Sequence, residues 1–305
     1  MRIVGIAALL VLVGATGATA VLAAGEQDGV VAELNHLYVT LRKESIEAIS
    51  TSTLLPERFS VVQVQTVNAG TESWTGTYLL GWTAYLELFA PGGAQGFTEG
   101  SSGIGFSVPR LGSGAVVRER LSGVPGEVAT SFLRNLQVDE KTSVPWFEAI
   151  SMKSLESPAF SAWLMDFRPE IIEFRKVATA GGNLVGRHAY MAAIFTAPEK
   201  REAFEKVSFD DLREVHLELS PEEAGSFERF AGGLGWSAAS DGARQTFRAG
   251  PFTIVVATMP DPDYRVRTIV CLLRRDAGPA AEHTFGPDAR LRVEGHSATW
   301  SFGPR

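Results

Sequence analysis

A short segment that occurs twice constrains the fold of this chain more than any other feature. Residues 84–91 and 162–169 both read Ala, an aromatic residue, Leu, two variable positions, Phe, one variable position and Pro. Side chains that alternate between two faces, as in each copy, indicate a β-strand. The match predicts a repeated unit whose copies end on corresponding strands.

The elements that precede each copy follow a similar order. The first copy closes a β-α-β-β-β series, in which a helix ends at Pro56 and four strands have alternating patterns: 35–41, 59–67, 74–80 and 83–89. The second copy closes a less regular series, with helices expected at 114–121 and 128–136 and with strands at 104–108, 144–152 and 160–167. The sequence therefore predicts an α+β fold built from βαβββ modules.

A third βαβββ-like unit is expected near the C-terminus. Its helix has Ser220 as a cap and Pro221 in its first turn, which are typical of a helix start. We expect it to comprise a strand at 215–219, the helix at 221–234 and strands at 245–247, 252–257 and 266–273. A hairpin that turns at Glu294-Gly295 should follow over residues 290–302.

The first 24 residues have the layout of a secretory signal peptide. Arg2 precedes an apolar stretch from Ile3 to Val13, and small residues follow, with cleavage expected after Ala20 or in the Ala23-Ala24 pair. The alternative is an uncleaved membrane anchor, although the apolar stretch is short for a bilayer span of about 20 residues. We predict export to the periplasm or the extracellular space, with no membrane attachment after cleavage.

Composition excludes several classes of protein and partner. A formal net charge of −7 argues against duplex nucleic acid as a partner, because that binding needs a concentrated basic surface. The single cysteine, Cys271, cannot form a disulfide within the chain, so the fold depends on its hydrophobic core. The 45% of hydrophobic residues are typical of a globular protein.

Two segments carry a resemblance to a known superfamily. NHLYVTL, with His36 on the first strand, and YLELFAP, with Glu87 on the fourth, resemble the vicinal oxygen chelate superfamily of glyoxalase I, extradiol dioxygenases and bleomycin-resistance proteins. The mature chain is most similar to a family of secreted bacterial glyoxalase-like proteins that carries no assigned activity. Five segments support this similarity: NHLYV, GIGFSV, PWF, WLMDFRPE and ATWSF.

The resemblance implies an architecture and a division of the chain. Paired modules of this superfamily form curved mixed sheets around a cleft. We accordingly expect a signal peptide (1–24), paired glyoxalase-like modules (29–169), a helical connector (170–212) and a C-terminal βαβββ-like unit (213–305).

The resemblance also implies a divalent metal ion, such as Zn, Fe, Mn or Ni. Metal-binding members of the superfamily supply a His and a carboxylate from each module, which matches His36 and Glu87 here. The second module departs from this pattern, because the expected counterparts are Gly105 and Met165, and Asp166 would point to the opposite face.

A third metal ligand would have to come from elsewhere in the chain. If the first and third units paired, His216 could join His36 and Glu87, with Cys271 as a fourth ligand. The alternative is that His216 is an ordinary strand histidine and Cys271 a small buried residue.

Aromatic residues near His36 and Glu87 suggest a small-molecule site. Parity along the strands places Tyr38, Tyr85 and Phe89 on the face of the polar pair, and Trp163 is the matching aromatic residue of the second copy. We expect these four side chains to line an apolar pocket or to pack as core.

The sequence leaves three functions open. The first is an exported glyoxalase-like protein that binds a small apolar or oxygenated ligand. The second is a metal-dependent lyase, isomerase or dioxygenase that uses His36 and Glu87, and the third is a periplasmic interaction protein whose protein partner is unknown. For a functional pair, His36 Nε2 should lie within about 5 Å of a Glu87 oxygen, and the alternative is a plain buried hydrogen bond between the two side chains.

Overall fold

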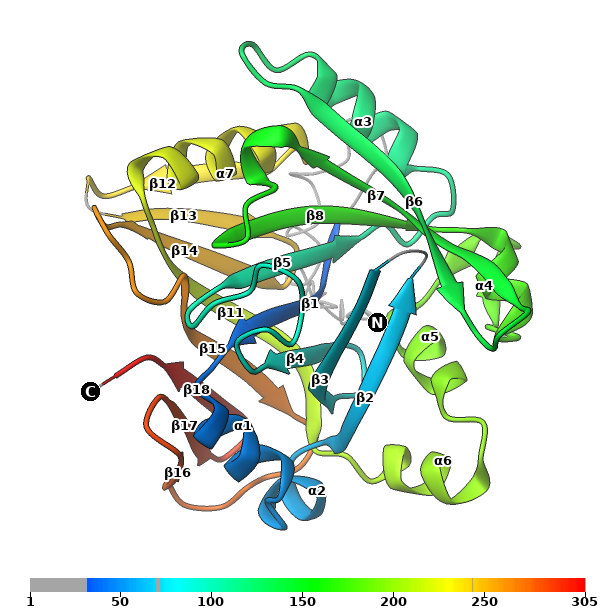
Figure 1. The fold of residues 1–305 in the computed structure, drawn as a ribbon, viewed down its shortest axis with the longest axis vertical. Coiled ribbons are helices and arrows are strands. Elements are labelled where there is room, and N and C mark those ends of the chain that lie inside the picture. The colour runs from blue at the N-terminus through cyan, green and yellow to red at the C-terminus, as the bar shows by residue number, and fades with distance from the viewer. Residues whose placement is uncertain (1–31, 70–71, 243, 305) are drawn as a thin grey trace, which may run out of the picture.

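The computed structural model describes residues 32–69, 72–242 and 244–304. The predicted signal peptide lies outside these residues. Within them, no helix is both long and apolar enough to cross a membrane. Figure 1 shows two sheet systems side by side, a barrel formed by the N-terminal half of the chain and an open sheet formed by the C-terminal half.

The first βαβββ module has the predicted order, with β4 returning to pair in parallel with β1. Its helical segment is divided into two helices, and Pro56 lies inside the second instead of ending the first. The elements are β1 (Glu33–Thr40), α1 (Lys43–Ser50), α2 (Leu54–Arg58), β2 (Val61–Ala69), β3 (Glu72–Leu80) and β4 (Tyr85–Phe89).

The second module repeats this topology, with β5 and β8 paired in parallel. The prediction of a helix at 128–136 is wrong. This segment forms β6, which pairs with β7 along its whole length, and the pairing overrides the local helical spacing. The elements are β5 (Ser102–Ser107), α3 (Gly114–Ser122), β6 (Ala129–Gln137), β7 (Ser143–Met152), a 3-10 turn (Lys153–Leu155) and β8 (Phe160–Phe167).

The two modules pair edge to edge and close an eight-stranded barrel in the order β1-β4-β3-β2-β6-β7-β8-β5. The two seams between the modules differ in extent. Six residue pairs join β1 to β5, whereas only Ala69 and Leu136 join β2 to β6. The expected α+β fold of repeated βαβββ modules with curved sheets is therefore confirmed.

A connector joins the barrel to the second sheet. It contains α4 (Pro169–Phe174), a small hairpin of β9 (Thr179–Ala180) and β10 (Leu184–Val185), α5 (Arg187–Ile194) and α6 (Pro198–Glu205). The C-terminal part then begins with β11 at Phe209, four residues before the expected boundary at 213.

The C-terminal half is an open sheet in the order β12-β13-β14-β11-β15-β18-β17-β16. Its βαβββ unit is β11 (Phe209–Leu219), α7 (Pro221–Gly233), β12 (Ser237–Ser240), β13 (Arg244–Ala249) and β14 (Phe252–Thr258). Ser220 and Glu223 form a capping box at the start of α7, as the helix-start pattern implies.

The strand expected at 266–273 as the end of this unit instead begins a further group. This group consists of β15 (Val266–Leu273), β16 (Ala281–Phe285), β17 (Ala289–Glu294) and β18 (Ser297–Phe302). The expectation was wrong because it overlooked the short strand β12, so each later strand was assigned a position one too early in the unit. The C-terminal hairpin is present and turns at Gly295 as predicted.

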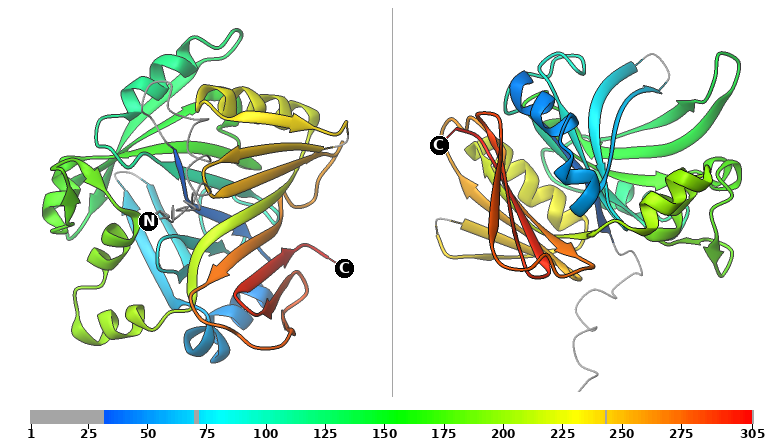
Figure 2. Two further views of the ribbon diagram at one scale, coloured as in Figure 1. Left: turned by 180° about the vertical axis from the view of Figure 1, so that it is seen from behind. Right: turned by 90° about the horizontal axis from the view of Figure 1, so that it is seen from below.

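Figure 2 shows the C-terminal sheet beside the barrel. The main core contains residues from the outer surface of the barrel and from one face of this sheet. Leu37 of β1, Leu86 of β4 and Phe106 of β5 point into it, with Ile254 and Trp300 on the opposing sheet. Because side chains alternate along a strand, the neighbours of these residues point into the barrel. The candidate site therefore lies on the inner face.

Candidate functional site

The parallel pairing of β1 and β4 places the sequence-predicted residues on one inner face. His36 is opposite Tyr85, and Tyr38 is opposite Glu87. His36 and Glu87 are thus diagonal neighbours on one face of the β1–β4 pair. We use the name Glu87 site for Glu87 together with five surrounding residues: His36, Tyr38, Tyr78, Tyr85 and Trp163.

Two glycines of β5 make room for this arrangement. Gly105 is paired with His36, and a Cβ atom there would lie 2.6 Å from His36 Cε1. A Cβ atom on Gly103 would lie 2.3 Å from Tyr38 Cε1. Both distances are shorter than real Cβ contacts, so the absence of side chains at these two positions of β5 allows His36 and Tyr38 to lie across the strand.

His36 is buried and is held by its neighbours instead of by Glu87. Its Nδ1 donates to Asn35 Oδ1 at 3.0 Å, and the Asn35 amide donates to Ser107 Oγ at 3.3 Å. Asn35 occupies an irregular position in the β1–β5 register, and this lets its side chain reach His36. The imidazole stacks on Tyr85 at 4.5 Å and meets the edge of Trp163 at 5.3 Å.

Burial lowers the pKa of His36 to about 3, so the imidazole is neutral at physiological pH. With Nδ1 as donor, Nε2 carries the free lone pair. The alternative interpretation, a plain hydrogen bond between His36 and Glu87, is not found among the described residues, where the ring bonds to Asn35. The two side chains share a face without pairing.

Glu87 is the most unusual residue of the barrel interior. Protein atoms surround its carboxyl group, yet the side chain keeps some accessible surface. Burial alone raises its pKa from 4.5 to about 8, with no hydrogen bond or opposing charge from the described residues to offset it. A carboxyl group buried in this way is costly, and such a cost is typical of functional sites.

Three tyrosines lie around this carboxyl group. Burial is the main cause of the raised pKa of Tyr38, Tyr78 and Tyr85, and the charge of Glu87 raises each of them further. The hydroxyl groups of two of them already have partners, since Tyr38 contacts Ser161 Oγ at 2.9 Å and Tyr78 accepts from Trp74 Nε1 at 2.9 Å.

The predicted aromatic residues come together as expected from strand parity. Tyr38 contacts Trp163, with ring centroids 6.0 Å apart, and Phe89 at 5.9 Å. Phe97, from the glycine-rich segment between the modules, stacks on Tyr38 at 4.7 Å. Phe89 is fully buried against these rings, whereas Trp163 and Tyr85 remain partly exposed.

The connector helix α5 packs against the inner faces of both modules. Tyr190 stacks on Phe167 at 4.2 Å and accepts a hydrogen bond from Trp146 Nε1 at 2.7 Å. The next residue, Met191, packs in a cluster with Tyr78 of the first module. The sequence analysis predicted no role in the site for Tyr190 or Met191. The one sequence signal for such a role is the spacing of apolar residues within α5.

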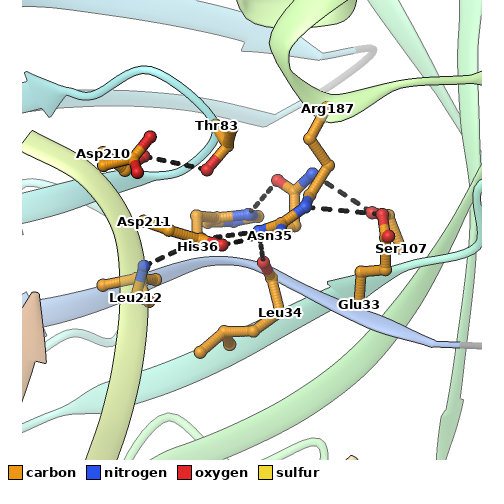
Figure 3. A network of polar contacts seen from close by, with 10 residues as sticks. All are labelled: Glu33, Leu34, Asn35, His36, Thr83, Ser107, Arg187, Asp210, Asp211 and Leu212. Carbon is orange, nitrogen blue, oxygen red and sulfur yellow. Dashed lines mark hydrogen bonds and ion pairs between the residues drawn. The ribbon is translucent and has the colours of Figure 1, made fainter. Parts of the chain in front are cut away.

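Arg187 anchors the start of α5, as Figure 3 shows. Its guanidinium group donates two hydrogen bonds to Asp211 on β11, at 2.7 and 2.8 Å, and one to the Leu34 carbonyl on β1 at 2.9 Å. Glu33 lies 3.4 Å from Arg187 Nε. One side chain therefore joins the connector, the barrel and the C-terminal sheet.

The structure agrees with the predicted counterparts in the second module. Trp163 pairs with Gly105 as Tyr85 pairs with His36, so Met165 takes the place of Glu87. Asp166 points away from the interior and accepts hydrogen bonds from Gly112 and Gly114 at the start of α3, both at 3.0 Å.

The side chains present do not form a complete metal centre. His36 and Glu87 are two potential ligands, and the described residues contain no group of three or more His, Cys, Asp or Glu side chains placed to hold an ion. The third expected ligand, His216, lies on β11 in the other sheet and bonds to Glu214. Modules one and two pair with each other, so the proposed pairing of units one and three is wrong.

Cys271 cannot act as a fourth ligand either. It lies fully buried on β15, and burial raises the pKa of its thiol. It is the small core residue of the alternative interpretation.

A profile of a protein family matches residues 34–302, nearly all of the described chain. The chain belongs to DUF5829. This is described as a family of unknown function. A comparison with curated proteins gives no match.

Two solved structures are similar at low identity. A hypothetical protein from Staphylococcus aureus is 8% identical with a TM-score of 0.44, over 75% of this chain and 86% of that one. The 2,2',3-trihydroxybiphenyl 1,2-dioxygenase from dibenzofuran-degrading Sphingomonas wittichii strain RW1 is 10% identical with a TM-score of 0.43, over 90% of this chain and 91% of that one. Neither likeness is strong enough to assign an activity to this DUF5829 protein.

Proposed function

We propose that this DUF5829 protein binds a small organic cation at the Glu87 site. The observation that carries the proposal is the Glu87 carboxyl group, which is enclosed by aromatic side chains, has no protein partner among the described residues and keeps accessible surface. A ligand that brings a positive charge or a hydrogen-bond donor would satisfy this group. The relation to the vicinal oxygen chelate superfamily, in which module pairs enclose a ligand, is part of the same proposal.

The surroundings favour a cation with an apolar body. Aromatic ring faces attract ammonium groups by about 0.5–2 kcal/mol each, and more strongly where water is excluded. Tyr38, Tyr78 and Tyr85 provide aromatic rings near the carboxyl group, close enough for its charge to raise the pKa of each hydroxyl group. A neutral His36 adds no repulsion, because its pKa of about 3 leaves the imidazole uncharged at pH 7.

The proposal has a direct thermodynamic signature. At pH 7 the free carboxyl group is mostly protonated, because its pKa is about 8. A bound cation would favour the carboxylate, so binding should release nearly one proton per ligand. Titration calorimetry in two buffers with different ionisation enthalpies measures this release.

The test uses two probes of nearly equal shape. Choline carries a quaternary ammonium group, and 3,3-dimethylbutan-1-ol replaces it with a neutral tert-butyl group. We expect choline to bind at least about tenfold more tightly, and we expect Glu87→Gln to reduce this preference. Glu148→Gln is the matched control, because Glu148 pairs with Arg118 near α3, outside the site.

Equal binding of the two probes, or a preference for choline that Glu87→Gln leaves unchanged, would overturn the proposal. Metal analysis of the purified protein tests the alternative function. Stoichiometric divalent metal that His36→Ala removes would favour the metal-dependent enzyme instead. Export remains part of the proposal, and N-terminal sequencing of the mature protein tests cleavage near residue 24.

A further inference from the structure

The C-terminal sheet has a polar face on the side away from the core. A cavity of about 330 Å³ opens on this face. Its floor contains small or polar side chains of the central strands, including Ala257, Thr268 and Ser301, and three arginines lie around them. We call the set of Arg244, Arg267, Arg290, His216, Thr268 and Ser301 the arginine pocket.

A β-bulge directs Arg267 into this pocket. In the pairing of β11 with β15, His216 faces Thr268 and Leu217 faces Val266, so Arg267 is the extra residue. A bulge of this kind turns a side chain that would otherwise point to the opposite face. Arg267 and its neighbour Thr268 therefore both line the cavity.

Two contacts hold the Arg267 side chain in place. Glu218 lies 3.5 Å from its Nε. Its guanidinium group also packs against the backbone of Gly303, where a Cβ atom would lie 2.0 Å from Nη1. Gly303 has φ +98°, a conformation that favours glycine, so the C-terminal segment leaves space for the arginine.

The other two arginines lie on strands near opposite edges of the sheet. Arg244 lies on β13 and Arg290 on β17, five strand positions apart, which in a flat sheet would separate their backbones by about 24 Å. Both nevertheless line one small cavity, so their long side chains lean toward its centre. Neither side chain forms an ion pair with another described residue.

The pocket has an excess of positive charge on an acidic protein. Three guanidinium groups face one carboxylate, Glu218, whereas the whole chain carries a formal charge of −7. Guanidinium groups bind phosphate and carboxylate in a bidentate manner, and the hydroxyl groups of Thr268 and Ser301 can donate further hydrogen bonds to anionic oxygens. Two arginines without an ion pair, Arg244 and Arg290, beside a cavity floor of small and polar side chains thus point to an anionic ligand.

We infer that the arginine pocket binds a small dianion bearing a phosphate group or two carboxylate groups. This site is separate from the Glu87 site. It lies in the other half of the chain, on the far side of the shared core, and it selects the opposite charge. The result of a binding test at the arginine pocket is therefore independent of the result at the proposed cation site.

The test is calorimetric titration of the full-length mature protein in a buffer free of phosphate at low ionic strength. Inorganic phosphate and malonate are the two probes, and sodium chloride at matched ionic strength is the blank. We expect saturable binding of at least one probe, weakened by added salt. The tighter probe identifies the phosphate or the dicarboxylate class.

Variants assign the binding to the pocket. Arg244→Gln and Arg290→Gln should each weaken binding by about tenfold or more. Arg248→Gln is the matched control, because Arg248 lies on the same strand and is exposed but does not line the cavity, and it should change affinity less than about twofold. Circular dichroism verifies that each variant is folded.

Three results would overturn the inference. The first is the absence of binding by either probe beyond that of chloride. The second is unchanged affinity in both Arg244→Gln and Arg290→Gln. The third is an equal loss in Arg248→Gln, which would show that anions respond only to the general charge of the surface.

Discussion

Glutamine in place of Glu87 should stabilise the folded protein in a strongly pH-dependent way. The glutamine amide resembles the protonated acid in shape and charge, so it removes only the effect of ionisation. In the folded state the pKa of Glu87 is about 8, compared with 4.5 for an unperturbed glutamate. Between these values the unfolded chain releases a proton that the folded chain keeps.

This difference in proton binding makes the folded state less stable as the pH rises. The contribution of Glu87 to stability is fully present below pH 4.5, and it is lost as the pH rises toward 8. At about 1.4 kcal/mol for each pH unit, the loss reaches about 5 kcal/mol above pH 8. The Gln variant does not experience this loss.

Urea unfolding of both proteins at pH 4.5, 6, 7, 8 and 9 measures the effect. We expect the difference in unfolding free energy to be near zero at pH 4.5, to increase with pH and to level off above pH 8 in favour of the variant. A difference that stays constant with pH, or that favours the wild type at pH 9, would refute the assignment of Glu87 as an unpaired buried acid.

Three further changes probe the surroundings of the site. His36→Gln should make the stability of the protein less sensitive to acid. The folded pKa of His36 is about 3, below the ordinary 6.5, so the wild type loses stability as the pH falls from 6.5 toward 3. Urea unfolding at pH 4 and pH 7 tests this, and an equal loss of unfolding free energy in both proteins would contradict it. Gly105→Ala should cost about 1–3 kcal/mol because its Cβ atom would overlap the His36 ring, and an unchanged urea midpoint would show that the ring can move aside. Arg187→Met should cost about 3 kcal/mol by leaving Asp211 without its partner, and should speed proteolytic cleavage of the connector, whereas wild-type resistance would show that α5 is held by apolar packing alone.

The repeated architecture could be predicted from sequence because each module carries its own local pattern. The segments ending at Pro91 and Pro169 correspond in register, as their shared residues imply. The errors arose where local pattern and pairing disagree. A helix was expected at 128–136, but residues 129–137 form β6 because β7 provides a pairing partner along their length.

The candidate site could be predicted only up to the inner face. Strand parity placed Tyr38, Tyr85 and Glu87 together, since alternation within a strand is a local property. It could not show that Asn35 would bond to His36, because that contact depends on an irregularity in the β1–β5 register. The contribution of Arg187 depends on a partner in β11, far along the chain, and no local signal identifies it.

The pairing of His36 with Gly105 bears on how a duplicated gene can diverge. If two copies of the first module associated as the two modules do here, two imidazoles would compete for one space across the seam. Two copies of the second module would place glycine against glycine and leave that space empty. Each module has thus become the specific complement of the other, one providing the side chain and the other the room for it.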